Sequence, residues 1–175
     1  MISELTTERL IMRPFKEKEA HLIFELDSNP KVMDHLGIAT MKNIEEGAKV
    51  IESLIAQYKD HGIGRYVVEL KETGEFIGWA GLKYMPELIN DHQNHYDLGY
   101  RFSSKHWGRG YATEASKAWL EYADGIGQMS PIHAYTAEGH VASQQVLLKC
   151  GFELAGRFHD GLGWCTWLNR RSQNH

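Results

Sequence analysis

The chain has 175 residues, a formal net charge of −4, and 42% hydrophobic and 24% charged residues. These values predict one folded domain, over residues 1–175, and argue against disorder and against a broad nucleic-acid surface, which would need a basic face. Two cysteines are too few for a disulfide framework or a zinc site. The first residues contain no apolar signal core, and no 18-residue apolar run occurs. We therefore expect a cytoplasmic protein without membrane contact, and the acidic excess favours amine or cationic substrates.

The first third of the chain predicts a short strand followed by helices. Residues 9–15 read as a strand that Pro14 stops. A helix over residues 17–27 and a short helical turn at residues 31–36 come next. Asn43 is placed to cap a longer helix. The apolar stripe expected on that helix consists of Ile44, Ala48, Ile51, Ile55 and Tyr58.

Strands and helices alternate in the remainder of the sequence. Residues 65–70 and 76–85 predict a hairpin around a Lys-Glu-Thr-Gly turn, and residues 86–95 a polar loop. The further expected elements are a strand over 96–102, a helix after Gly110, a strand over 132–136, a helix over 141–149 with Ala142, Val146 and Cys150 inward, strands over 152–158 and 162–168, and a polar tail over 169–175. No linker or repeat divides this order.

The most informative stretch reads YDLGYRFSSKHWGRGYATEASKAWLEYA and begins at Tyr96. A strand, a turn with Gly108 and Gly110, and a helix N-terminus follow one another directly. Glycines allow a close backbone approach to a ligand, and the first amides of a helix have no intrahelical partner. Arg109 adds a full positive charge. The stretch therefore predicts an anion site, although an ordinary strand–helix turn would carry the same two glycines.

Within this stretch the string FSSKHWGRGYATEA closely resembles the acyl-CoA loop of the GNAT N-acetyltransferases, in particular the RimJ/RimL-like branch that modifies ribosomal-protein N-termini. The opening TERLIMRPF is similar to the first strand of that branch. The resemblance implies the α/β GNAT fold: a mixed, mostly antiparallel sheet of about seven strands, flanked by helices, in which the strands over 96–102 and 132–136 splay apart. It also implies that acetyl-CoA is bound by Phe102, Trp107, Gly108, Arg109, Gly110, Tyr111, Ala112, Thr113, His140 and Ser143. Trp107 stands where the general family pattern has Gln or Arg, a departure that this branch shares.

A second segment, HVASQQVLLKCGF from His140, resembles the family helix that contacts the pantetheine arm. His140 replaces the usual Asn, and an imidazole can donate a similar hydrogen bond. Leu147 replaces the Tyr that often protonates the departing thiolate, and leucine has no proton to give. Ser143 lies one helical turn earlier, where a serine of this branch is thought to serve the thiolate. A serine that bonds nearby backbone at a helix start is the alternative.

The reaction that the resemblance implies needs an amine that loses a proton and a polarised thioester carbonyl. A backbone N–H near Tyr100 could polarise the carbonyl. Candidate bases are Asp97, Glu69 and His95, through water, with His133 as a further candidate; a structural or solvated role is the alternative for each. We assign catalysis to Ser143, Asp97 and Tyr100, and we expect no catalytic metal because no histidine pair has ligand spacing with carboxylates.

The sequence thus predicts an N-acetyltransferase that transfers acetyl from acetyl-CoA directly to a primary amine in a ternary complex. The amine could belong to a protein N-terminus or to a small molecule. A non-catalytic acyl-CoA sensor is the alternative that His140 and Leu147 keep open. Expected partners are acetyl-CoA and the amine, without nucleic acid or membrane, and a homodimer is compatible with this reading.

Overall fold

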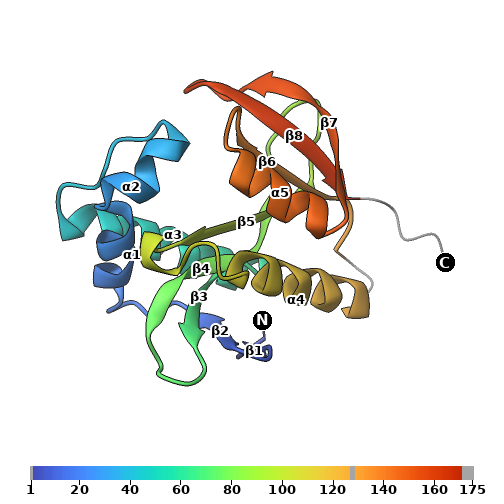
Figure 1. The fold of residues 1–175 in the computed structure, drawn as a ribbon. Coiled ribbons are helices and arrows are strands. Elements are labelled where there is room, and N and C mark those ends of the chain that lie inside the picture. Colours follow the sequence, from blue (N-terminus) through green and yellow to red (C-terminus); the bar gives the residue numbers. More distant parts are fainter. Residues whose placement is uncertain (1, 127–128, 171–175) are drawn as a thin grey trace.

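A computed structural model describes residues 2–126 and 129–170 of the chain (Figure 1). Its centre is one eight-stranded sheet in the order β1-β2-β3-β4-β5-β6-β8-β7, in which only β5 and β6 run parallel. The strands are β1 (Leu5–Thr6), β2 (Leu10–Pro14), β3 (Arg65–Leu70), β4 (Phe76–Met85), β5 (His95–Phe102), β6 (Ile132–Ala137), β7 (Phe152–His159) and β8 (Trp164–Arg170).

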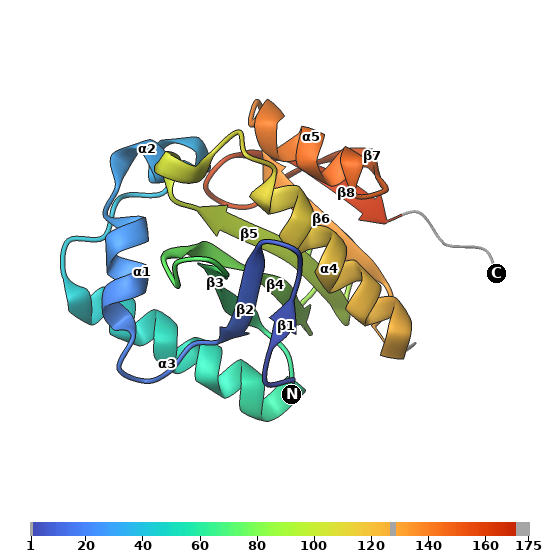
Figure 2. The same ribbon diagram turned by 60° about the horizontal axis from the view of Figure 1, so that its bottom comes forward.

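Helices cover both faces of this sheet. In Figure 2, α4 crosses one face in front of the strands, while α1 and α3 lie at the other side of the sheet. The helices are α1 (Ala20–Asp27), α2 (Pro30–Met33), α3 (Ile44–His61), α4 (Tyr111–Ile126) and α5 (Val141–Lys149), with 3-10 turns η1 (Asp34–Leu36) and η2 (Ser104–His106). Every helix within the described residues is too short or too polar to cross a membrane.

Parallel pairing between β5 and β6 covers only two residue pairs, Tyr96 with Ile132 and Asp97 with His133. β5 remains paired with β4 along its whole length, and β6 remains paired with β8. The sheet therefore opens between the C-terminal halves of β5 and β6, as the family resemblance implies. This opening, which we call the β5–β6 gap, lies beside α4 and α5 (Figure 1).

The core lies between the sheet and its helices. Trp119 of α4 is fully buried, and its ring meets Tyr66 of β3 edge-on with centroids 4.8 Å apart. Asn43 caps α3 by accepting from the Glu46 amide, as the sequence predicts, and Gly62 ends the helix in the left-handed conformation.

The structure corrects several expectations about individual elements. β1 was not predicted, because two residues carry too little pattern, and α1 begins at Ala20 rather than at residue 17. Ile44 is 46% exposed, and Leu54 takes the expected core position on α3. On α5, Ala142 is exposed and Leu147 faces the core. The predicted tail is shorter, since β8 continues to Arg170; residues 171–175 of that tail lie outside the described residues.

Candidate active site

The loop between β5 and α4 has the backbone of an anion site. Gly108 and Gly110 have φ angles of 74° and 82°, a region that favours glycine. A Cβ at Gly108 would meet nothing within 4 Å, so the loop surface is open there. Helix α4 starts at Tyr111, and its first recorded backbone bond is Glu114 N–H to Gly110 C=O. Among the described residues no acceptor is recorded for the first-turn amides, which are therefore available to a phosphate.

Arg9, from the turn before β2, holds this loop from outside. Its guanidinium donates to the backbone carbonyl of Arg109 (3.0 Å) and to the Glu114 carboxylate (2.6 Å), and it lies 4.5 Å above the Tyr111 ring centroid. Burial opposes ionisation of Glu114, but hydrogen bonds from Thr7 and Arg9 outweigh it and lower the pKa of its carboxyl. Arg9 thus fixes the loop carbonyl and leaves the loop amides free.

The other end of the loop is fixed by two aromatic rings. The Trp107 indole N–H donates to the Phe102 carbonyl (2.8 Å), so the ring that replaces the usual Gln or Arg closes the turn. The buried His106 ring lies 3.2 Å from the Glu75 carboxylate in the β3–β4 turn. Arg109 itself is exposed.

The backbone of β5 presents an unpaired edge to the β5–β6 gap. The Tyr96 N–H donates to the Pro131 carbonyl, just before β6. Because the N–H groups of a strand alternate between its two edges, the Tyr100 N–H points the same way. Pairing with β6 ends at Asp97, so the ladder supplies no partner for this amide. The position suits the expected carbonyl-polarising donor.

Two hydroxyl groups meet across the gap on the α5 side. The Tyr100 hydroxyl donates to the Ser143 carbonyl at 3.0 Å and lies 3.0 Å from the Ser143 Oγ. Burial raises the pKa of the Tyr100 phenol well above its usual value, so the phenol stays protonated. Leu147, one turn later on α5, is buried. Ser143 is therefore half of a hydroxyl pair, a partnership that the sequence reasoning missed.

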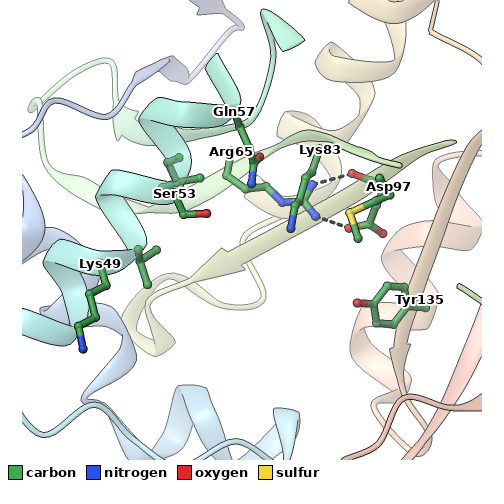
Figure 3. A pocket seen from close by; sticks show the side chains of 10 residues that line it. Lys49, Ser53, Gln57, Arg65, Lys83, Asp97 and Tyr135 are labelled. Atoms are coloured by element: carbon green, nitrogen blue, oxygen red, sulfur yellow. Dashed lines mark hydrogen bonds and ion pairs between the residues drawn. The ribbon is translucent and has the colours of Figure 1, made fainter. Parts of the chain in front are cut away.

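A cavity of about 410 Å³ lies on the other side of β5 (Figure 3). α3 forms one wall, and residues of β3, β4, β5 and β6 form the rest. Asp97 lines it, and its Oδ2 forms an ion pair with Arg65. The Arg65 guanidinium also donates to the Asp97 backbone carbonyl (2.7 Å) and to the Gly81 carbonyl. Tyr135 of β6 points its hydroxyl into the cavity from the side opposite α3, and burial raises its pKa to about 12.

Of the candidate bases, only Asp97 lines this cavity. Glu69 is paired instead with Arg13 at 2.5 Å, which also holds Glu19. The structure thus brings Asp97 to the cavity and leaves Glu69 out of it.

His95 and His133 belong to a buried aromatic cluster around Trp167, at the closed end of the gap. His133 Nδ1–H donates to Asn169 Oδ1 (2.8 Å), and neither ring nitrogen of His95 has a recorded partner. Burial lowers the pKa of His95; burial, reinforced by His92, lowers that of His133 to about 4. Both rings are therefore neutral at pH 7, and His95 is fully shielded from solvent.

His140 lies at the start of α5, where the resemblance places a pantetheine contact. Its ring stacks on His35 of η1 with centroids 4.9 Å apart and planes 7° apart, and His35 lies 5.7 Å from the Trp107 ring. Burial, together with His35, lowers the pKa of His140. His35 thus connects two predicted cofactor contacts. No sequence signal marked it, since it lies about a hundred residues from His140.

Among residues 2–126 and 129–170, no cluster of three or more His, Cys, Asp or Glu side chains is arranged to hold a metal ion. The absence of a catalytic metal stays a prediction.

The comparisons with known proteins agree with this geometry. A family model described as an acetyltransferase (GNAT) domain matches residues 9–153. The uncharacterized N-acetyltransferase YoaA of Bacillus subtilis is 31% identical over 156 residues, which are 89% of this chain and 86% of that protein. A GnaT-family acetyltransferase structure from Bordetella pertussis gives a TM-score of 0.83 at 20% identity, covering 97% of this chain and 100% of that one.

RimL, a ribosomal alpha-N-protein acetyltransferase solved with coenzyme A, gives a TM-score of 0.80 at 16% identity, covering 95% of this chain and 97% of that one. At such identity the likeness concerns the fold alone. The family match and the relative in Bacillus decide the classification: the chain belongs to the GNAT acetyltransferase family and is an acyl-CoA-dependent acetyltransferase.

The role of Arg9 can be tested by substitution. Arg9→Ala should weaken acetyl-CoA binding about fivefold, because the Arg109 carbonyl loses the donor that holds the loop in place. The effect is modest because the ion pair that is lost with Glu114 is partly exposed. Calorimetric titration with acetyl-CoA measures this. Arg157→Ala is the matched control, since Arg157 forms an exposed pair with Glu138 away from the loop. Equal affinities for the two variants would show that Arg9 does not position the loop.

The neutral state of His133 has a consequence for stability. The unfolded chain, with a His pKa near 6.5, takes up a proton before the folded chain, with a pKa of about 4. The contribution of the neutral His133 ring to the free energy of unfolding is therefore present above about pH 6.5 and is lost as the pH falls toward 4. Thermal unfolding of His133→Gln between about pH 7 and pH 4.5 should show a smaller decrease in Tm than the parent protein. His21→Gln, at an exposed site on α1, should show the same dependence of Tm on pH as the parent protein. The same dependence in His133→Gln as well would show that His133 is not the group responsible.

Proposed function

We propose that the protein transfers an acetyl group from acetyl-CoA to a primary amine by direct attack across the β5–β6 gap. The observation that carries this proposal is the unpaired Tyr100 amide, which lies between the loop with free amides on one side and the Asp97 cavity on the other. A donor already fixed in a strand stabilises charge on a carbonyl oxygen without reorganisation.

The residues present fit acetyl-CoA. The loop from Trp107 to Thr113 offers backbone donors and one free guanidinium to a pyrophosphate, with Phe102 behind it and His140 and Ser143 along the approach to the gap. Acetyl-CoA supplies the activated acyl group when bound. The chain's own residues orient the bound acetyl-CoA, and α4 and α5 exclude water from one side of it.

Proton movements are assigned to groups on the two sides of β5. On the cavity side, Asp97 Oδ1 has no recorded hydrogen bond among the described residues and can receive the amine proton, directly or through water. On the α5 side, the Ser143 and Tyr100 hydroxyls together can donate to the leaving thiolate. This pair supplies what Leu147 cannot, and it argues against the acyl-CoA sensor.

Finer aspects of the function also belong to this proposal. The RimJ/RimL-like branch is supported by the loop sequence, while the likeness to the RimL structure concerns the fold alone. A cytoplasmic location, a single domain over residues 1–175 and a homodimer stay predictions.

Loop binding is tested first. Gly110→Pro should abolish detectable acetyl-CoA binding in a folded protein, because proline cannot adopt a φ of 82° and removes an amide. Calorimetry measures the affinity, and circular dichroism confirms the fold. Gly161→Pro places the same change in the exposed turn between β7 and β8, at a φ of 97°, and should bind normally. Unchanged binding by folded Gly110→Pro would remove the loop from the site.

The hydroxyl pair is tested by kinetics. Ser143→Ala should lower kcat at least tenfold with little change in the Kd for acetyl-CoA, since losing one preorganised donor typically costs about 10²–10³ in rate and Tyr100 retains part of the function. Tyr100→Phe should lower kcat similarly, and the double variant should lose less than the product of the two single losses. Gln145→Ala, on the exposed side of α5, is the control. A kcat within twofold of the parent in both single variants would leave protonation to water.

A further inference from the structure

The cavity beside Asp97 has a charge opposite to that of the whole chain. Its lining contains three cationic side chains, Lys49, Arg65 and Lys83, and one anionic side chain, Asp97. Arg65 and Asp97 neutralise each other in their ion pair. Neither lysine has an ion-pair partner recorded within the described residues, so the cavity keeps a formal charge of about +2 at pH 7.

Lys83 is the better placed of the two lysines. Its Cα is paired with that of Asp97 across the β4–β5 ladder, so the two side chains leave the same face of the sheet. The side chain is only partly exposed, and Figure 3 shows it directed into the cavity beside the Arg65 guanidinium. Lys49 stands on the opposite, exposed rim, on α3.

Neutral polar groups complete the lining. The Tyr135 hydroxyl faces the cavity from β6, and Ser53 and Gln57 face it from α3 (Figure 3). The Gln57 Oε1 is buried without a recorded hydrogen bond in the described part of the chain. Such an acceptor in the lining is suited to an amine N–H, while the ammonium groups are suited to an oxyanion.

On the basis of the proposed function, we propose that the acetyl acceptor is a small primary amine that also carries an anionic group, a carboxylate or a phosphate, bound by Lys83 with Lys49 at the rim. The amine then lies toward Asp97 and the gap. The volume of about 410 Å³ suits a small molecule. A polycationic amine would meet two unpaired ammonium groups and only one carboxylate, which Arg65 already occupies.

Matched amines test the acceptor class. Free amino acids, their carboxamides and their decarboxylated amines form one set, and phosphoethanolamine and ethanolamine form another. In the parent protein at low salt, the best acceptor should be an anionic member, with kcat/KM at least about tenfold above that of its neutral counterpart. The preference should shrink as salt rises. The two sets distinguish a carboxylate from a phosphate.

Variants connect the preference to the cavity. Lys83→Gln should reduce the anionic-to-neutral ratio about tenfold through KM, and Lys83→Arg should restore most of it. Lys59→Gln removes an exposed lysine of α3 that does not line the cavity and should leave the ratio unchanged. A best acceptor that is neutral or cationic, or an acidic peptide preferred to every small amine, would overturn the proposal while leaving acetyl transfer intact.

A binding measurement separates this inference from the proposed function. The same amines are titrated calorimetrically into the protein saturated with coenzyme A. Tighter binding of the anionic members, lost in Lys83→Gln, would support the site even if no amine were acetylated, and the proposed function alone would then fail. Equal binding of anionic and neutral members would overturn the site whether or not turnover occurs.

Discussion

The early end of parallel pairing between β5 and β6 is the constraint on which the site depends. Two residue pairs hold the strands together, and beyond Asp97 and His133 each strand keeps a partner only on its other side. An open sheet edge inside a protein is costly unless its polar groups are satisfied. The closed end is packed by the cluster around Trp167, and the open end is bridged by the hydroxyls of Tyr100 and Ser143. The fold thus keeps the Tyr100 amide in place without a partner in the ladder, and a substrate carbonyl can supply its missing acceptor.

Two glycines allow the cavity side of this arrangement to form. A Cβ at Gly99 would lie 2.5 Å from the Arg65 guanidinium, so glycine lets that side chain lie over β5 and reach Asp97 without a shift. Gly81 lies beside it on β4, and its carbonyl accepts from the same guanidinium. Arg65 therefore spans three neighbouring strands and holds the Asp97 carboxylate by one oxygen. The ion pair fixes the orientation of Asp97, and the other oxygen remains free for chemistry.

Local patterns in the sequence were sufficient for most of the individual elements, and the family resemblance implied the arrangement of the sheet. The strands over 65–70 and 76–85 and the helix over 141–149 have the predicted bounds, because alternation and turn residues act over short distances. The contacts that orient the site depend on tertiary structure and leave no such pattern. Arg9 and Glu114 are 105 residues apart, and His35 and His140 are about as distant. Ile44 shows the related error, since a helical stripe does not say which of its ends the sheet covers.

The net charge of the chain does not describe the charge of the acceptor cavity, for a physical reason. A formal charge of −4 describes all 175 residues, and most of those charges lie on a surface where salt screens them over about 8–10 Å. A bound amine responds mainly to the groups that share its cavity, where the dielectric constant is lower and the distances are short. There the sign is reversed, because Arg65 balances the charge of Asp97 and neither lysine has an ion-pair partner within the described residues. The chain can therefore be acidic as a whole and still select an anionic amine, since selection depends on which charges are left unpaired at the site.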